Sequence, residues 1–299
     1  MRLAPARAVP ISCPMSPASQ AARSLKSALI GQVRAVFNDQ AKGEKPVQRQ
    51  PDLSMFGPHS LVWRVHGDVT TMMVGGVTAL LLQMLHPAVL AGVWDHSSFR
   101  GDMLGRLRRT ARFIAVTTYG AAEEAEAAID KVRDVHTRVK GNLPDGTPYA
   151  ADEPELLAWV HVTEAVSFLD AWIRYAEPNM SAADQDRYFA DFARIAEALG
   201  ADPIPRSRAE ADALIAAMRP ELVVDARTRE VARMVLDQPA PNLAVKPFQL
   251  LTFQAAVDLL PDWARRMHGL SGPGLATPVV RMGTGGIAST MRWAFSSGR

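Results

Sequence analysis

A long segment without a charged side chain, Val69–Trp94, limits most strongly what this chain can fold into. It exceeds the ~18 apolar residues that make a candidate membrane span. Gly75, Gly76, Gln83 and the pair His86-Pro87 interrupt it, and a proline ends or kinks a helix because it lacks a backbone donor. We therefore expect a core helix followed by a second helical piece, with a membrane-spanning or membrane-dipping segment as the alternative.

Length and composition narrow the class of protein. The chain has 299 residues, which at ~100–200 residues per domain means one large domain or two small ones. With 48% hydrophobic and 21% charged residues, it falls among soluble globular proteins. The single cysteine, Cys13, excludes an internal disulfide framework and a cysteine-based zinc or iron–sulfur site. The formal charge of +2 is too small for a general nucleic-acid binder, so no nucleic-acid partner is expected.

The N-terminal stretch lacks the pattern of a secretory signal peptide. Pro10, Pro14 and Pro17 break it, so no apolar run of roughly 7–15 residues follows the basic start. We expect a cytoplasmic protein, and we leave a peripheral membrane contact open.

Helical periodicity accounts for most of the remaining chain. Helices are expected over Leu61–His66, Leu104–Thr118, Ala121–Lys140, Pro154–Tyr175, Ser181–Leu199, Arg208–Arg219, Ala226–Leu236, Pro247–Leu260 and Pro261–Met267. Turn chemistry at Pro144–Gly146 predicts a loop over Asn142–Pro154, and no alternation typical of a strand is present. The predicted fold class is all-α, a single large helical domain.

Three regions are predicted along the chain. Residues 1–50 form a loosely attached arm with one short helix, Ala21–Phe37, and residues 51–270 form the helical core domain. Residues 271–299 form an irregular tail, because Gly-Pro-Gly and Gly-Thr-Gly-Gly sequences interrupt them.

Common catalytic motifs are absent. The chain has no phosphate-binding P-loop, no G-x-S-x-G elbow and no H-E-x-x-H sequence. The glycine-rich run Gly283–Gly286 follows no predicted strand and opens no predicted long helix, so a nucleotide site is not expected there. The remaining candidates are histidines on or beside apolar helix faces, each of which is either a hydrogen-bonded core residue or a ligand.

His136 is the strongest of these candidates. It lies on the apolar stripe of its predicted helix, beside Val132 and Val139, with no carboxylate one turn away on that stripe. An apolar environment keeps the imidazole neutral, which leaves a nitrogen able to bind a metal. Helical proteins hold haem iron on its proximal side with such a histidine.

Arg106, Arg109 and Thr110 form a second candidate group. Their spacing places two guanidinium groups and a hydroxyl on one face of a predicted helix. Such a group is suited to holding carboxylates or to polarising bound dioxygen or substrate. The alternative is a solvated basic face.

His161 and Glu164 form a third candidate pair. Residues three apart on a helix point the same way, so this pair is a candidate for a non-haem metal. Carboxylate-bridged di-iron sites use Glu-x-x-His twice with further glutamates, whereas this chain has the reversed order once. A supporting or structural hydrogen-bond pair is the alternative.

Several of these segments together resemble the MpaB-type and rubber oxygenase catalytic-domain family, in its uncharacterised bacterial branch. The resemblance covers roughly residues 55–270 and rests on these runs: Trp63–Asp68, Ala79–Pro87, Asp95–Ser97, Gly105–Thr110, Val132–Gly141 and Trp159–His161. The resemblance implies an all-helical, globin-like core that holds a b-type haem. It also implies cleavage of double bonds in apolar chains with dioxygen, as in the latex clearing proteins.

The resemblance also implies roles for particular residues. The proximal histidine lies in a Val-Arg-x-x-His segment, which matches Val132–His136 here. The distal side carries Arg-x-x-Lys-Thr, which matches Arg106–Thr110 except that Arg109 replaces the lysine. Arginine is bulkier than lysine and permanently charged. We therefore expect this difference to affect whether a polymer is the substrate more than whether haem is bound. The fungal branch of the family contains membrane-bound oxygenases of terpenoid chains. By that resemblance, Val69–Trp94 would be a segment that contacts the membrane.

The resulting hypothesis is a haem-dependent oxygenase or oxidase that uses dioxygen on a hydrophobic, isoprenoid or lipid-like substrate. His136 would be the axial iron ligand, Arg106, Arg109 and Thr110 would line the distal side, and Arg106 and His161 would help to hold the cofactor, with His86 nearby. Three alternatives remain: a haem carrier or gas sensor without turnover, a non-haem metalloprotein using His161 and Glu164, and a helical interaction protein.

Overall fold

The computed structural model describes residues 43–240, 243 and 245–295, together with residues 24, 26, 27, 30 and 31. Most of the predicted N-terminal arm, including most of the predicted helix Ala21–Phe37, lies outside these described residues. The described part of the chain is helical apart from one short hairpin, which confirms the all-α prediction.

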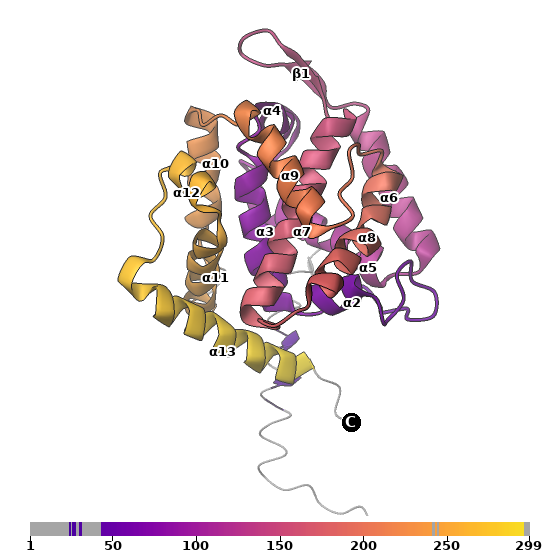
Figure 1. Ribbon diagram of the computed structural model, residues 1–299, viewed down its shortest axis with the longest axis vertical. Helices are drawn as coiled ribbons and strands as arrows, with labels where there is room; N and C mark the ends of the chain where they lie inside the picture. The colour runs from indigo at the N-terminus through magenta and orange to yellow at the C-terminus, as the bar shows by residue number, and fades with distance from the viewer. Residues whose placement is uncertain are drawn as a thin grey trace, which may run out of the picture.

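The helices follow one another with short connections (Figure 1). Their bounds are α2 Leu61–His66, α3 Val69–Gln83, α4 Pro87–His96, α5 Met103–Tyr119, α6 Ala122–His136, α7 Pro154–Tyr175, α8 Ala182–Leu199, α9 Arg208–Met218, α10 Ala226–Leu236, α11 Lys246–Leu259, α12 Asp262–His268 and α13 Thr277–Phe295. Short 3₁₀ turns lie at Arg219–Glu221 and Gly274–Ala276.

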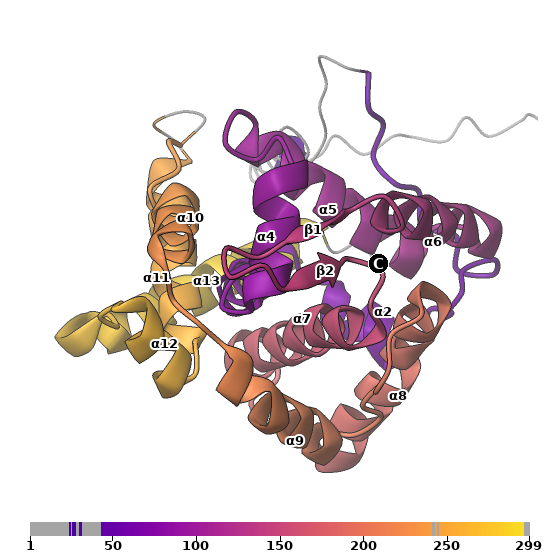
Figure 2. The same ribbon diagram turned by 90° about the horizontal axis from the view of Figure 1, so that it is seen from above.

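The core is built around the buried pair α3 and α7. Figure 2 shows α7 with α8 and α9 on one side, α5 and α6 on another, and α10, α11 and α12 together on a third. The contacts of α3 are mainly with α7 and α11. Gly75 of α3 allows this close approach, because a Cβ atom there would lie 2.8 Å from the backbone oxygen of Ser167. The fully buried Phe168 of α7 packs at this contact, and the fully buried Trp159 packs farther along the pair, where its indole nitrogen donates to the backbone oxygen of Gln83.

The apolar run Val69–Trp94 forms two helices rather than one, as predicted. Asp68 caps α3 by accepting hydrogen bonds from the backbone nitrogens of Thr70 and Thr71, and Pro87 occupies the first turn of α4. The two helices bend by 104° at the break between them. Most of α3 is buried against α7 and α11, which explains the lack of charge.

Among the described helices, one is long and apolar enough by itself to cross a membrane. It is α7, and 72% of its most apolar window is buried inside the molecule. The bent pair α3 and α4 passes the same test only when taken together.

Two sequence predictions about secondary structure are wrong. The predicted helix Ala121–Lys140 ends at His136, and a hairpin follows in which β1 (Lys140–Asn142) pairs antiparallel with β2 (Pro148–Ala150). Strands of three residues are too short for an alternating pattern to register in the sequence. Gly141 admits the Tyr149 ring across the hairpin, since a Cβ atom at Gly141 would lie 2.7 Å from the Tyr149 hydroxyl.

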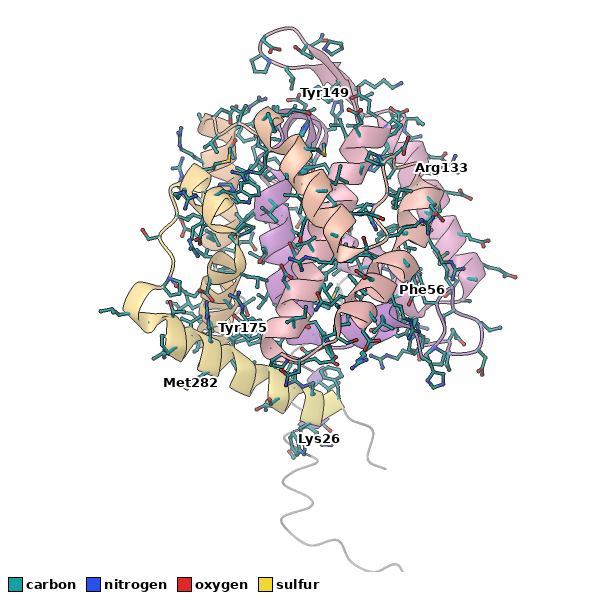
Figure 3. All side chains as sticks on the ribbon, in the orientation of Figure 1. Lys26, Phe56, Arg133, Tyr149, Tyr175 and Met282 are labelled. Atoms are coloured by element: carbon teal, nitrogen blue, oxygen red, sulfur yellow. The ribbon has the colours of Figure 1, made fainter. Side chains whose placement is uncertain are left out.

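The second wrong prediction is the irregular tail, because residues 277–295 form the helix α13. It lies across the ends of α3, α7 and α11 (Figure 1), and Figure 3 labels Tyr175 where α7 ends near it and Met282 on its outer side. Glycines cost about 1 kcal/mol each in a helix. Burial of Val280, Thr284, Ala288 and Met291 on one face against the molecule outweighs that cost.

Candidate active site

A large cavity lies between α3, α5, α11 and α13. Its volume is about 870 Å³, within the range of sites that hold cofactors and small molecules. Its walls are mainly apolar and include Met72, Leu80, Leu107, Ile114, Phe253 and Ile287.

Two polar side chains meet in the buried part of this cavity. Gln83, at the end of α3, donates from Nε2 to the backbone oxygen of Val160 (3.3 Å) and to Oε1 of Glu164 (3.5 Å). Burial raises the pKa of Glu164 to about 7, while the hydrogen bond from Gln83 acts in the opposite direction. Glu164 therefore exchanges its proton near neutral pH within an apolar enclosure.

His66 also lines the cavity, but both of its ring nitrogens are engaged. Nδ1 lies 3.0 Å from Oγ1 of Thr118, and Nε2 lies 3.0 Å from the hydroxyl of Tyr188. Burial lowers the pKa of His66 to about 3. The ring is therefore a neutral, hydrogen-bonded part of the wall, with no nitrogen left for a metal.

Arg106 and Thr110 of α5, two of the residues singled out in the sequence, line the cavity. Nη1 of Arg106 donates to Oγ of Ser97 at 2.8 Å, which holds the guanidinium in place. Burial, and to a smaller degree the charge of Arg109, lowers the pKa of Arg106. Arg106 thus supplies a positive charge, and Thr110 a hydroxyl, to an apolar wall.

Arg109 does not join them. Its Nη1 lies 3.6 Å from Oδ2 of Asp102, the residue that caps α5, and its side chain is 56% exposed. The spacing alone would allow Arg109 to share a face with Arg106 and Thr110, but its exposed side chain is directed to Asp102, and it is not part of the cavity wall. The structure therefore separates Arg109 from the two residues predicted to act with it.

His136 is the last residue of α6 and is half-buried. The helices α5 and α6 run antiparallel on either side of Gly120, which brings His136 and Arg106 to the same end of the pair. Burial lowers the pKa of His136, the Asp152 charge raises it, and the Arg106 charge lowers it further. Among the described residues the ring has no hydrogen-bond partner, and the ring is not part of the wall of the cavity.

His161 is buried on α7 outside the cavity wall. Its ring centroid lies 4.9 Å from that of Phe192, its Nε2 has no hydrogen-bond partner among the described residues, and burial lowers its pKa to about 4. No group of three or more His, Cys, Asp or Glu side chains comes together as a metal site in the described part of the chain. A non-haem site built on His161 and Glu164 therefore has no third ligand there.

Two other histidines, His86 and His96, have partners outside the cavity. Nε2 of His86 lies 3.4 Å from Oε2 of Glu221, and Nε2 of His96 lies 3.1 Å from the backbone oxygen of Lys140. Sequence analysis missed Gln83 as a site residue. The available signal was that Gln83 is the one amide side chain in the charge-free run Val69–Trp94.

Comparison with known families matches this chain to one of them. The model described as "ER-bound oxygenase mpaB/B'/Rubber oxygenase, catalytic domain" matches residues 63–294. The chain belongs to this family. The match confirms the resemblance seen in the sequence, and it extends through α13.

Membership of the MpaB and rubber oxygenase family indicates an oxygenase, an enzyme that uses dioxygen and a small-molecule substrate. No curated protein and no solved structure matches the chain at a significant level. The finer assignment of this family member therefore depends on the residues of its own cavity.

Proposed function

We propose that this protein is a haem-dependent oxygenase that acts with dioxygen on a hydrophobic substrate of isoprenoid or lipid-like character. The observation that carries the proposal is the apolar cavity of about 870 Å³ with Arg106 and Thr110 in its wall. His136 lies outside that wall, but near enough to Arg106 for the guanidinium charge to lower the pKa of its imidazole. Family membership supports the oxygenase part. The apolar wall supports the substrate class, since burial of apolar surface favours such a ligand.

The chemistry of the donor set fits haem b. Burial lowers the pKa of the half-buried His136, and its ring makes no hydrogen bond to any described residue, so a ring nitrogen is available to bind iron beside the cavity wall that Arg106 contributes to. When bound, haem supplies the redox-active iron needed for reactions with dioxygen. His136 is thus the residue proposed to hold the group.

Arg106 and Thr110 are proposed to act on the reacting groups. The Arg106 guanidinium, held by Ser97 in a partly buried position, stabilises negative charge that develops nearby or binds a carboxylate of the cofactor. The Thr110 hydroxyl donates a hydrogen bond to an oxygen atom in the cavity. Arg109 has no part in this proposal because it pairs with Asp102.

Absorption spectra of the purified protein test the cofactor. We expect a Soret band that shifts on reduction with dithionite, and loss of most of the bound haem in His136→Ala. The exposed His59 offers a matched control, so His59→Ala should keep the haem content of the wild type. Added imidazole should restore the Soret band of His136→Gly. A wild-type protein without a Soret band, or His136→Ala with full haem content, would overturn the assignment.

Oxygen consumption tests the activity separately. The reduced protein should consume dioxygen in the presence of an apolar alkene such as squalene, and Arg106→Met should slow this consumption by about 10- to 1,000-fold, the range for loss of a charge-stabilising group. A stable oxygen complex with no consumption would instead identify a haem protein without turnover.

A further inference from the structure

The inner part of the cavity carries an amide oxygen of Gln83 and a carboxyl group of Glu164 that together point to a specific ligand group. The backbone oxygen of Val160 can only accept, so the Gln83 amide must direct its nitrogen to Val160 and keep its Oε1 on the other side. The same nitrogen donates to Oε1 of Glu164, which leaves Oε2 of Glu164. Among the described residues no donor reaches Oε1 of Gln83 or Oε2 of Glu164.

These acceptors lie in apolar surroundings. Leu80, Val77 and Phe168 line the same cavity, and Gln83 is only 9% exposed. Both side chains line the cavity, so a ligand that fills it removes water from their oxygen atoms. An occupant that donates a hydrogen bond here is therefore favoured over one that is apolar throughout.

The charges around the cavity select among possible donors. Glu164 is the one acidic residue among its described lining residues, whereas Arg49, Arg106, Arg108 and Arg112 all contribute to the wall. This excess of positive charge disfavours an ammonium group. A carboxylate would place its charge beside the carboxyl group of Glu164 and has no proton to donate. A hydroxyl group is neutral and both donates and accepts.

We infer that Gln83 and Glu164 form a subsite for the hydroxyl group of an otherwise apolar substrate, so that the ligand of this cavity is a long-chain or terpenoid alcohol. The hydroxyl donates a hydrogen bond to Oε1 of Gln83 and accepts a second one from the carboxyl group of Glu164. The raised pKa of Glu164 allows its carboxyl group to act as the donor of that second bond at neutral pH. Gln83 and Glu164 are positioning residues in this inference, which rests on the proposed function for the identity of the cavity as the substrate site.

Binding of two matched ligands to the purified protein tests the subsite. Titration calorimetry with 1-decanol and with 1-methoxydecane compares a hydroxyl with an ether oxygen that cannot donate. In Gln83→Met, a change that keeps the shape and removes the acceptor, 1-decanol should bind about three- to tenfold more weakly, whereas 1-methoxydecane should change less than about twofold.

A control variant and a second test variant show whether the weaker binding of 1-decanol comes from the proposed subsite. Gln249 on α11 also lines the cavity, with its amide donating to the backbone oxygen of Gln238 at 2.7 Å. Gln249→Met should leave the preference for 1-decanol unchanged. Glu164→Leu should weaken 1-decanol in the same way as Gln83→Met, which keeps the test decisive if either variant alone misfolds.

Several outcomes would overturn the inference. Equal losses for both ligands would show a change of shape rather than a lost hydrogen bond, and no loss for 1-decanol would place its hydroxyl elsewhere. Tighter binding of decylammonium than of 1-decanol would identify a cation site. Because binding is measured without turnover, a protein without haem that prefers 1-decanol would refute the proposed function alone, and a haem protein without this preference would refute the subsite alone.

Discussion

Buried titratable side chains make opposite contributions to stability as the pH changes. Burial raises the pKa of Glu164 to about 7, from 4.5, so the folded state retains this proton at a pH where the unfolded chain has lost it. Stability from this group therefore falls as the pH rises from about 4.5 to 7. His66 and His161 have lowered pKa values, about 3 and 4, so their contribution is full above pH 6.5 and is lost as the pH falls towards those values.

Glu164→Gln isolates the contribution of the carboxyl group. As the pH rises from 5 to 8, the difference in free energy of unfolding between the variant and the wild type should shift in favour of the variant by about 2–3 kcal/mol. The reason is that only the wild type must ionise a buried acid. Urea denaturation of both proteins at several pH values measures this difference, in which the histidine contributions cancel. A difference that stays constant with pH would contradict the raised pKa.

At the crossing of α3 and α7 the two helices pack so closely that one added carbon atom decides whether they fit together. A Cβ atom at Gly75 would lie 2.8 Å from the backbone oxygen of Ser167 and 3.0 Å from Cα of Phe168, and backbone cannot move aside cheaply. The neighbouring Gly76 has room, since the nearest atom to its added Cβ would be Cε1 of Phe168 at 3.9 Å.

The two glycines therefore make a matched pair of variants. Gly75→Ala should lower the free energy of unfolding by about 1–3 kcal/mol through overpacking. Gly76→Ala should be neutral or should raise it by up to about 1 kcal/mol, because alanine favours a helix more than glycine does. Thermal and urea denaturation measure both. Equal effects would show that α3 and α7 are not in close contact at Gly75.

At the scale of the whole molecule, the buried carboxylates of Asp258 and Asp68 hold the C-terminal helix α13 against the other helices. Asp258 of α11, only 5% exposed in its side chain, accepts from Arg281 of α13 (2.8 Å) and from Arg174 of α7 (2.9 Å). Asp68, also buried, pairs with Arg292 near the end of α13. Since α13 forms one wall of the cavity, the ion pairs that hold this helix also hold that wall in place.

Asp258→Asn should lower the free energy of unfolding by about 1–3 kcal/mol, because it removes the charge that two arginines share. It should also speed tryptic cleavage within α13. The ion pair of Arg265 with the exposed Asp262 provides the control, and Asp262→Asn should change stability by less than about 1 kcal/mol. Equal cleavage rates in the two variants would show that Asp258 does not retain α13.

Local signals in the sequence predicted much of the helical framework. The predicted helix Pro154–Tyr175 has the same bounds as α7, and the predicted helix Ser181–Leu199 matches α8, which Ser181 caps by accepting from the backbone nitrogen of Asp184. The helix α13 was missed because its glycines were given more weight than the buried spacing of Val280, Thr284, Ala288 and Met291. That spacing was present in the sequence.

The sequence by itself determined most of the helices and the family, because these depend on residues within a few turns of one another or on short motifs such as Val132–His136. Only the tertiary structure decided that Gln83 meets Glu164 across the cavity, that Arg106 faces this cavity and that Arg109 turns to Asp102 instead. The physical reason is that the partner of a polar side chain is set by which helix faces pack together, and residues distant in the chain determine that packing.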